Sequence, residues 1–358
     1  MAINVDYLSR VPPASVAARD AEVPNEFVLT PIESLAVDEL ARDITASYES
    51  AEDPRFVMDA RTLAYELPRR LRVWAERMRQ SDGVPWFRIR SHRFPDEELG
   101  PTPPRFEPEP RSPALPQEIC LMLFGSLLGD PFGWETQQAG RLLHDIVPAP
   151  GQELSQTSAC SAAELAWHTE DAFHPYRADY LVLGCLRNPD ETSTTIACVS
   201  DLELDRATEA VLAQPRFLIA PDDSHSPAGL DDDAAWRDVE PVAILTGRHE
   251  RPMMRIDPEF MAVRDGDDEA QAALDRICEQ VEANLREIWF APGDYVFIDN
   301  HRCVHGRKPF VARFDGTDRW LKRLSLTRDL RKMTDAGVTP TGRQAQRTCS
   351  YEIEVTGA

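Results

Sequence analysis

The sequence is short of positive charge. Its 358 residues include 39 Lys and Arg against 61 Asp and Glu, which gives a formal net charge of -22. Because binding to nucleic acid or to an anionic membrane surface requires a basic patch, we expect neither partner. Apolar runs of the roughly 18 residues that span a bilayer are missing too. The first residues also lack the basic and apolar regions of a secretory signal, so none is expected.

Cysteine motifs are missing as well. The seven cysteines are odd in number and form no Cys-x-x-Cys, which indicates neither a disulfide framework nor a zinc knuckle. We interpret them as reduced thiols in a cytoplasmic protein. Proline is plentiful, with 29 residues, and this favours turns and irregular loops over a helical bundle. A hydrophobic share of 42% is enough for a sizeable core.

The spacing of apolar residues predicts a mainly β protein with added helices. Short strands joined by long loops are typical of a sandwich or barrel that carries helices. Helices are predicted at 31–48, 59–79, 117–128, 203–212 and 267–289. Strands are predicted at 84–90, 142–147, 180–186, 194–199, 241–245, 253–257, 294–298 and 319–327. We expect an extended arm over 1–30 and a connector over 95–116, where eight prolines exclude a regular element.

One short stretch carries chemistry, together with a residue far along the chain. His168 and Glu170 are two apart, so on a strand their side chains would share one face. His305 could complete a set of two histidines and one carboxylate, which suits a non-haem Fe(II) that keeps open positions. By itself, a His-x-Glu pattern is also compatible with an ordinary surface pair.

Three motifs strengthen this hypothesis, namely WHTEDAFHPYRADY (167–180), FIDNHRCVHGR (297–307) and DRWLKR (318–323). Over about residues 115–330 the chain resembles the clavaminate synthase-like Fe(II)/2-oxoglutarate oxygenases. Within that group it is most similar to the L-arginine 3-hydroxylases of viomycin and streptothricin biosynthesis. The resemblance implies a double-stranded β-helix (a cupin-like jelly roll) flanked by α-helices.

The resemblance also implies one oxygenase domain over 1–358. In this prediction, an N-terminal helical and irregular part (1–115) packs on the jelly-roll core (116–330), and a polar tail follows (331–358). A lid is expected at about 221–240.

The family's metal ligands correspond to His168, Glu170 and His305. The resemblance therefore implies Fe(II) as the cofactor, with 2-oxoglutarate and O2 as co-substrates. Related halogenases need room for chloride where Glu170 stands, so halogenation is not expected. Glu170 is also expected to contact the substrate. Three other histidines, His174, His225 and His301, are not expected to be ligands.

Two arginines match the family's positions for carboxylate recognition. Arg319 lies 14 residues after His305, where the family binds the distal carboxylate of 2-oxoglutarate, and a guanidinium pairs with a carboxylate in bidentate fashion. Arg323 matches the arginine that grips the α-carboxylate of the substrate. On one strand the two would share a face, about 13 Å apart at Cα. Thr195 matches a threonine that hydrogen-bonds 2-oxoglutarate, with Thr194 facing away. The structural alternative for the two arginines is that they lie on an ordinary solvated face of a strand.

Five further residues resemble the family's substrate contacts. Gln137 and Ser158 match positions near the α-amino group, although Ser158 would also suit a turn or cap. Asp222 opens the expected lid. Asp257 and Glu259 match an Asp-x-Asp pair that holds a guanidinium, and two carboxylates suit a planar cation. An Asp-Pro-Glu sequence is also an ordinary turn.

We therefore predict an enzyme that hydroxylates an unactivated C–H bond, at C3, of free L-arginine in peptide-antibiotic or other specialised amino-acid biosynthesis. The open alternatives are enduracididine, lysine, ornithine or citrulline as substrate, or desaturation or cyclisation of arginine. A non-enzymatic alternative is a silent jelly-roll binding protein. Such a relative would usually lose a metal ligand or the keto-acid arginine, and all four residues are present here.

Overall fold

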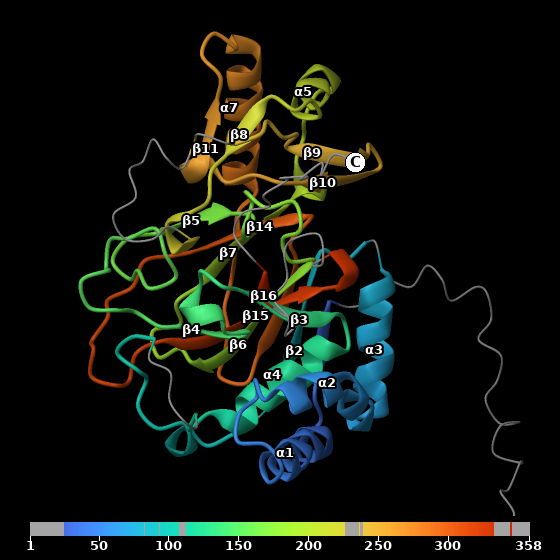
Figure 1. The fold of residues 1–358 in the computed structure, drawn as a ribbon, viewed down its shortest axis with the longest axis vertical. Helices are drawn as coiled ribbons and strands as arrows, with labels where there is room; N and C mark the ends of the chain where they lie inside the picture. Colours follow the sequence, from blue (N-terminus) through green and yellow to red (C-terminus); the bar gives the residue numbers. More distant parts are fainter. Residues whose placement is uncertain are drawn as a thin grey trace, which may run out of the picture.

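The computed structural model describes residues 25–81, 83–92, 94–106, 112–225, 236, 239–332 and 344–345. Most of the predicted arm, most of the tail and the greater part of the predicted lid lie outside these residues. Within them, the two larger β-sheets stand between two groups of helices (Figure 1).

The larger sheet has eight strands and is largely antiparallel. The strands β1 and β2, and likewise β3 and β16, pair in parallel, while β4 pairs with β15 beside the main path. In spatial order the strands are β1 (Glu26–Val28), β2 (Trp86–Arg90), β13 (Tyr295–Asp299), β6 (Tyr180–Arg187), β15 (Trp320–Thr327), β3 (Asp130–Trp134) and β16 (Gln344–Ala345), with β4 at Leu143–Ile146.

The smaller sheet has four antiparallel strands. They are β12 (Arg286–Ile288), β7 (Thr194–Cys198), β14 (Cys303–Arg307) and β5 (Leu165–His168), in that spatial order. Two separate antiparallel pairs join β9 (Leu245–Arg248) to β10 (Arg251–Met254) and β8 (Phe217–Ile219) to β11 (Met261–Val263).

The two sheets share a hydrophobic core. Leu183 on β6 and Leu321 on β15 belong to the same buried cluster as Ile196 on β7 and Cys303 on β14. Because side chains alternate along a strand, these contacts identify which face of each strand points between the sheets.

Helices cover the outer faces of both sheets. On the larger sheet, α1 (Pro31–Thr45), α2 (Pro54–Leu63), α3 (Arg69–Gln80) and α4 (Leu115–Ser126) form one cluster with Leu324 and Leu326 of β15. On the smaller sheet, α5 (Arg206–Leu212) and α7 (Asp268–Asn284) pack with Ala197 and Val304. These two groups lie at opposite ends of the molecule in Figure 1. Among the described residues, none of the helices has the length and apolarity needed to cross a bilayer.

Short 3-10 turns complete the described structure. They are η3 (Ala64–Glu66), η4 (Asp96–Glu98), η5 (Gln138–Gly140), η6 (Val199–Asp201), η7 (Asp223–His225) and η8 (Pro258–Phe260).

Three predicted elements differ from the structure. The helix predicted at 59–79 is wrong, because α2 and α3 are separated at Leu67, which has ψ 153°, and Pro68. Proline disfavours helical geometry at the residue before it and removes an N–H donor. The helix predicted at 267–289 ends at Asn284, and 286–288 form β12. The strand predicted at 241–245 is also wrong, since β9 begins only at Leu245.

Candidate metal centre and substrate pocket

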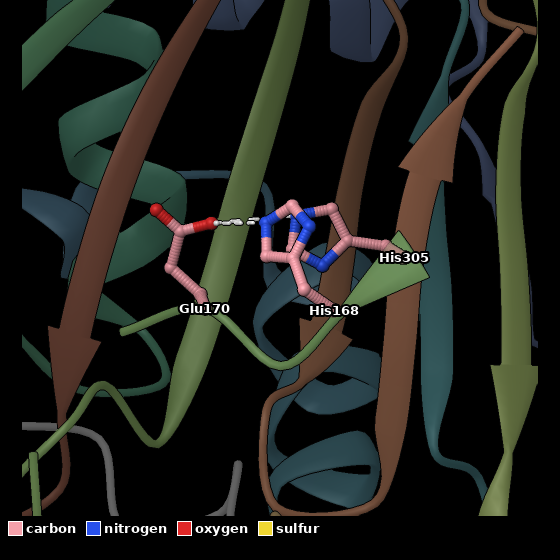
Figure 2. A group of neighbouring side chains, drawn as sticks. All are labelled: His168, Glu170 and His305. Atoms are coloured by element: carbon pink, nitrogen blue, oxygen red, sulfur yellow. Dashed lines mark ion pairs between the residues drawn. The ribbon is translucent and has the colours of Figure 1, made fainter. Parts of the chain in front are cut away.

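Two imidazoles and one carboxylate converge in the structure. His168 ends β5 and lies directly opposite His305 of β14. The Oε2 atom of Glu170 is 3.5 Å from Nε2 of His168 and 3.4 Å from Nε2 of His305. One ligand atom from each residue lies within 4.8 Å of the others. Figure 2 shows the carboxylate pointing toward the two rings.

Glu170 reaches this point from a turn and not from the strand. Since β5 ends at His168, the strand alternation expected from the sequence does not place Glu170. Its backbone is held by Asn300 instead. The Glu170 amide donates to Asn300 Oδ1 at 2.9 Å, and Asn300 Nδ2 donates to the Glu170 carbonyl at 3.0 Å and to the Ala178 carbonyl at 3.1 Å. Asn300 is fully buried, and no sequence pattern indicated that it supports Glu170.

The local electrostatics favour a cation between the two rings. Burial alone would raise the pKa of Glu170, but Arg323 and the two histidines hold it well below its usual range. Burial opposes a charge on His168, yet its bond to Glu170 and the charge of Asp257 raise its pKa to about 9. The Nδ1 atom of His168 lies 2.9 Å from the Ala166 carbonyl, which leaves Nε2 for a metal. The donor set therefore fits Fe(II).

A pocket of about 520 Å³ opens at these residues. It also brings together most of the residues expected from the sequence. Besides His168, Glu170 and His305, its lining includes Gln137, Ser158, Asp222, Asp257, Glu259, Arg319 and Arg323.

Arg323 bonds one oxygen of the Glu170 carboxylate and leaves the other oxygen facing the histidines. Its Nη1 bonds Oε1 of Glu170, while Oε2 faces the histidines. Its Nη2 donates to Gln137 Oε1 at 2.9 Å and lies 2.6 Å from His144 Nδ1. Burial and the adjacent Arg323 lower the pKa of His144 well below its usual value. His144 is therefore neutral, with Nδ1 as the acceptor and Nε2 bonded to the Arg141 carbonyl at 3.0 Å. No sequence pattern indicated this role of His144.

Arg319 is a buried cation without a carboxylate beside it among the described residues. Its side chain is 4% exposed, and its Nε atom has no hydrogen-bond partner in the described structure. Burial and the nearby Arg307 lower its pKa to about 10. A buried guanidinium with unmet donors fits the carboxylate of a ligand in the pocket.

The expected role of Thr195 is contradicted by the strand register. Residues directly opposite on paired strands point to the same side. Thr195 lies opposite Gly306, whereas Thr194 lies opposite Arg307 on the face of His305. The pocket is accordingly lined by Thr194 and not by Thr195. Alternation along the strand makes the two threonines face opposite ways, and the pairing with β14 decides which one faces the pocket.

Another wall of the pocket is acidic. Burial raises the pKa of Asp257 to about 7, and the charges of Asp222 and Glu259 act in the same direction, against the opposing effect of His168. All three carboxylates line the pocket. Asp257 is buried, whereas Asp222 is half-buried and Glu259 is exposed. Carboxylates gathered on one wall favour a cationic ligand, because its charge relieves their mutual repulsion.

The three histidines not expected to be ligands are bonded elsewhere. His225 Nε2 lies 2.9 Å from Asp171 Oδ1, and its Nδ1 lies 2.6 Å from Thr136 Oγ1. His301 Nε2 lies 2.9 Å from Asp179 Oδ1. His174 Nδ1 accepts from the Tyr176 amide at 3.1 Å.

Comparison with known proteins agrees with this geometry. Residues 240–325 match the model of the "Taurine catabolism dioxygenase TauD, TfdA family". The chain is 43% identical to the enduracididine beta-hydroxylase of Streptomyces hygroscopicus, over 86% of this chain and 96% of that protein. It is 37% identical to the L-ornithine/L-arginine 3-hydroxylase of Catenulispora acidiphila, over 86% and 95%. Clavaminate synthase 2 of Streptomyces clavuligerus is 32% identical, over 76% and 84%.

Solved structures show the same likeness. The non-heme iron oxygenase OrfP, crystallised with Fe, succinate and (3S)-hydroxy-L-Arg, has a TM-score of 0.84 and 41% identity, over 89% of this chain and 99% of that one. The same oxygenase has also been crystallised with Fe and L-Arg, with a TM-score of 0.78 to this chain. On these sequence and structural matches, the chain belongs to the clavaminate synthase-like family of Fe(II)/2-oxoglutarate-dependent oxygenases.

Proposed function

We propose that this protein uses Fe(II), 2-oxoglutarate and O2 to hydroxylate C3 of free L-arginine. The observation that carries the proposal is the layout of one pocket. Its candidate metal centre lies among a buried arginine, Arg319, a second arginine, Arg323, and a group of carboxylates. The two facing sheets are interpreted as a double-stranded β-helix within one domain. The proposal includes a cytoplasmic location for the protein, and its described cysteines are free.

His168, Glu170 and His305 would hold the iron. Iron bound with 2-oxoglutarate and O2 supplies the oxidising chemistry. Three protein ligands leave room for the keto acid and for O2. The contribution of the chain is to hold the ligands from two paired strands and one turn, and to line the pocket so that little water reaches the reacting carbon.

Arg319 would bind the distal carboxylate of 2-oxoglutarate. Its buried guanidinium has donors to offer, and Thr194, on the pocket face of β7, takes the place that the sequence assigned to Thr195. The keto acid is dianionic and Arg319 is cationic. Binding would therefore pair the buried guanidinium with a carboxylate through a charge-assisted bond, so that neither charge is left unpaired.

The amino-acid substrate would lie across the pocket from Arg323 to the acidic wall. Arg323 would receive the α-carboxylate, with Gln137 and Ser158 near the α-amino group. Asp257 and Glu259, with Asp222, would face the guanidinium. A neutral side chain such as citrulline would leave these carboxylates unpaired, which is costly for the buried Asp257.

A cyclic arginine derivative is the second candidate substrate. It is favoured by the 43% identity to a protein named enduracididine beta-hydroxylase. Glu259 is one methylene longer than the second aspartate of the family's Asp-x-Asp pair, so it can contact a substrate side chain of different shape. A cyclic guanidine keeps the positive charge that the acidic wall requires.

The test is a competition assay of arginine against enduracididine, lysine, ornithine and citrulline, with product mass spectrometry. We expect arginine to be consumed with the release of succinate, and Asp257→Ala and Glu259→Ala to reduce the preference for guanidino substrates. Preference for citrulline, or unchanged selectivity in Asp257→Ala, would contradict the guanidinium assignment while leaving the oxygenase chemistry in place. A product that gains no oxygen would instead indicate desaturation or cyclisation.

A further inference from the structure

The residue after Glu170 is the centre of a buried hydrogen-bond cluster. Asp171 is 2% exposed, and its Oδ2 accepts from Trp134 Nε1 at 2.6 Å. Its Oδ1 lies 2.9 Å from His225 Nε2 and accepts from Gln137 Nε2 at 3.3 Å. Asp171 also has a φ of 50°, a left-handed conformation that Asp and Asn tolerate better than most side chains. The bonds of this carboxylate therefore support a strained turn next to the metal ligand.

His225 is the other half of this cluster and comes from a distant segment. It ends the 3-10 turn η7 and is 1% exposed. Its ring packs edge-on against Trp134, with centroids 5.4 Å apart, and it also contacts Phe173. The same turn begins beside Asp222, whose Oδ1 accepts from the Ser224 amide at 2.7 Å. The bonds that fix His225 therefore also fix the segment whose Asp222 side chain lines the pocket.

The cluster is continuous with the candidate substrate site. Arg323 bonds both Glu170 and Gln137, and the Gln137 amide nitrogen in turn donates to Ser224 Oγ at 2.7 Å. Because Arg323 donates to Gln137 Oε1, the amide nitrogen must face Asp171 and Ser224. A continuous series of hydrogen bonds, through Arg323 and Gln137, thus joins the Glu170 carboxylate to the turn at 222–225.

Asp171, Asp222 and His225 come close enough to hold a cation, but the contacts point to another role. Both ring nitrogens of His225 have partners in Asp171 and Thr136. Both carboxylate oxygens of Asp171 are likewise engaged. The cluster is complete without a metal.

We propose that Asp171 and His225 form a positioning pair for the amino-acid substrate. Their buried bond fixes the 222–225 turn against the metal-ligand turn, so that Asp222 and the Gln137 amide face the substrate together. The proposal rests on the proposed function, because the amino acid is taken to lie between Arg323 and the acidic wall. Neither residue touches the substrate, and both act through Gln137 and Asp222.

The test compares His225→Phe, which keeps the aromatic packing but removes both nitrogens, with Asp171→Asn, which tolerates the same backbone conformation. We expect each to raise KM for the amino acid about tenfold, the loss typical of one buried charge-assisted bond. Affinity for Fe(II) and 2-oxoglutarate should stay within about twofold of the parent value, since their proposed ligands are not in the cluster. The double variant should be little worse than either single variant, because both substitutions break the same bond between Asp171 and His225.

His174→Phe is the matched control. His174 packs on the same Trp134 ring, with centroids 4.7 Å apart, but its Nδ1 bonds the Tyr176 amide. It should leave KM for the amino acid unchanged. His225→Gln, which restores one N–H donor, should recover part of the loss seen in His225→Phe. A purely structural role would instead affect His174→Phe and His225→Phe alike.

Hydrogen exchange provides a readout that does not depend on the substrate. In His225→Phe, amides 222–225 should exchange faster, while those of β5 and β14 keep the parent rates. Unchanged exchange at 222–225, or additive effects in the double variant, would overturn the positioning pair. If the parent protein turns over a different amino acid, the proposed function fails, and the same variants are then compared with that substrate.

Discussion

Asn300 holds the backbone of Glu170 in place, and we predict that Asn300→Ala weakens iron binding beyond its effect on stability. The side chain makes three hydrogen bonds, to the amide and carbonyl of Glu170 and to the carbonyl of Ala178. In the alanine variant these three buried groups lose their partners. Each unpaired buried group costs about 1–3 kcal/mol, so with three such groups we expect the free energy of unfolding to fall by at least about 3 kcal/mol.

Part of that loss should appear at the metal. A freed Glu170 turn no longer presents its carboxylate to His168 and His305 in one fixed geometry. Residues that support metal ligands typically contribute 10–100-fold to metal affinity, and we expect Asn300→Ala to lose affinity within this range. Anaerobic titration with Fe(II), followed by denaturant unfolding of the metal-free protein, separates the two effects.

Asn188→Ala is the matched control for this prediction. The Asn188 side chain is also buried and also makes three hydrogen bonds, two with Thr192 and one with the Phe290 carbonyl, but it does not line the pocket. It should lose a similar amount of stability and bind Fe(II) with the parent affinity. Equal losses of iron affinity in both variants would refute the reasoning, because the effect would then follow from general destabilisation.

Three further predictions concern the pocket itself. His305→Ala should abolish Fe(II)-dependent release of succinate, and turnover by the metal-stripped parent protein would contradict the ligand set. Arg319→Ala should raise KM for 2-oxoglutarate at least a hundredfold, a loss of about 3 kcal/mol for one buried charge pair, with little change in KM for the amino acid. Because burial raises the pKa of Asp257 to about 7, its carboxylate becomes charged only as pH rises through neutrality. KM for arginine should therefore fall between about pH 6 and pH 8, and Asp257→Asn should flatten that dependence. An equally steep profile in the variant would assign the titration to another group.

Many residues of the candidate site could be predicted from the sequence. The motifs carried His168, Glu170 and His305, and the spacing of Arg319 and Arg323 predicted that both would line one pocket, as they do. Apolar spacing also identified α4 and half of the strands in the two sheets, namely β2, β4, β6, β7, β13 and β15, because burial on one or both faces leaves a clear pattern. Strands of three residues, such as β8, β11 and β12, were missed since they are too short for such a pattern.

The tertiary structure decided what depends on contacts between distant segments. Alternation along β7 makes Thr194 and Thr195 face opposite ways, but only pairing with β14 puts Thr194 on the side of His305. Glu170 lies beyond its strand, and its position depends on Asn300, 130 residues away. A local sequence determines alternation and residue chemistry. It does not determine which face turns inward, because that choice is made by strand register and by hydrogen bonds that close only when the sheets have packed.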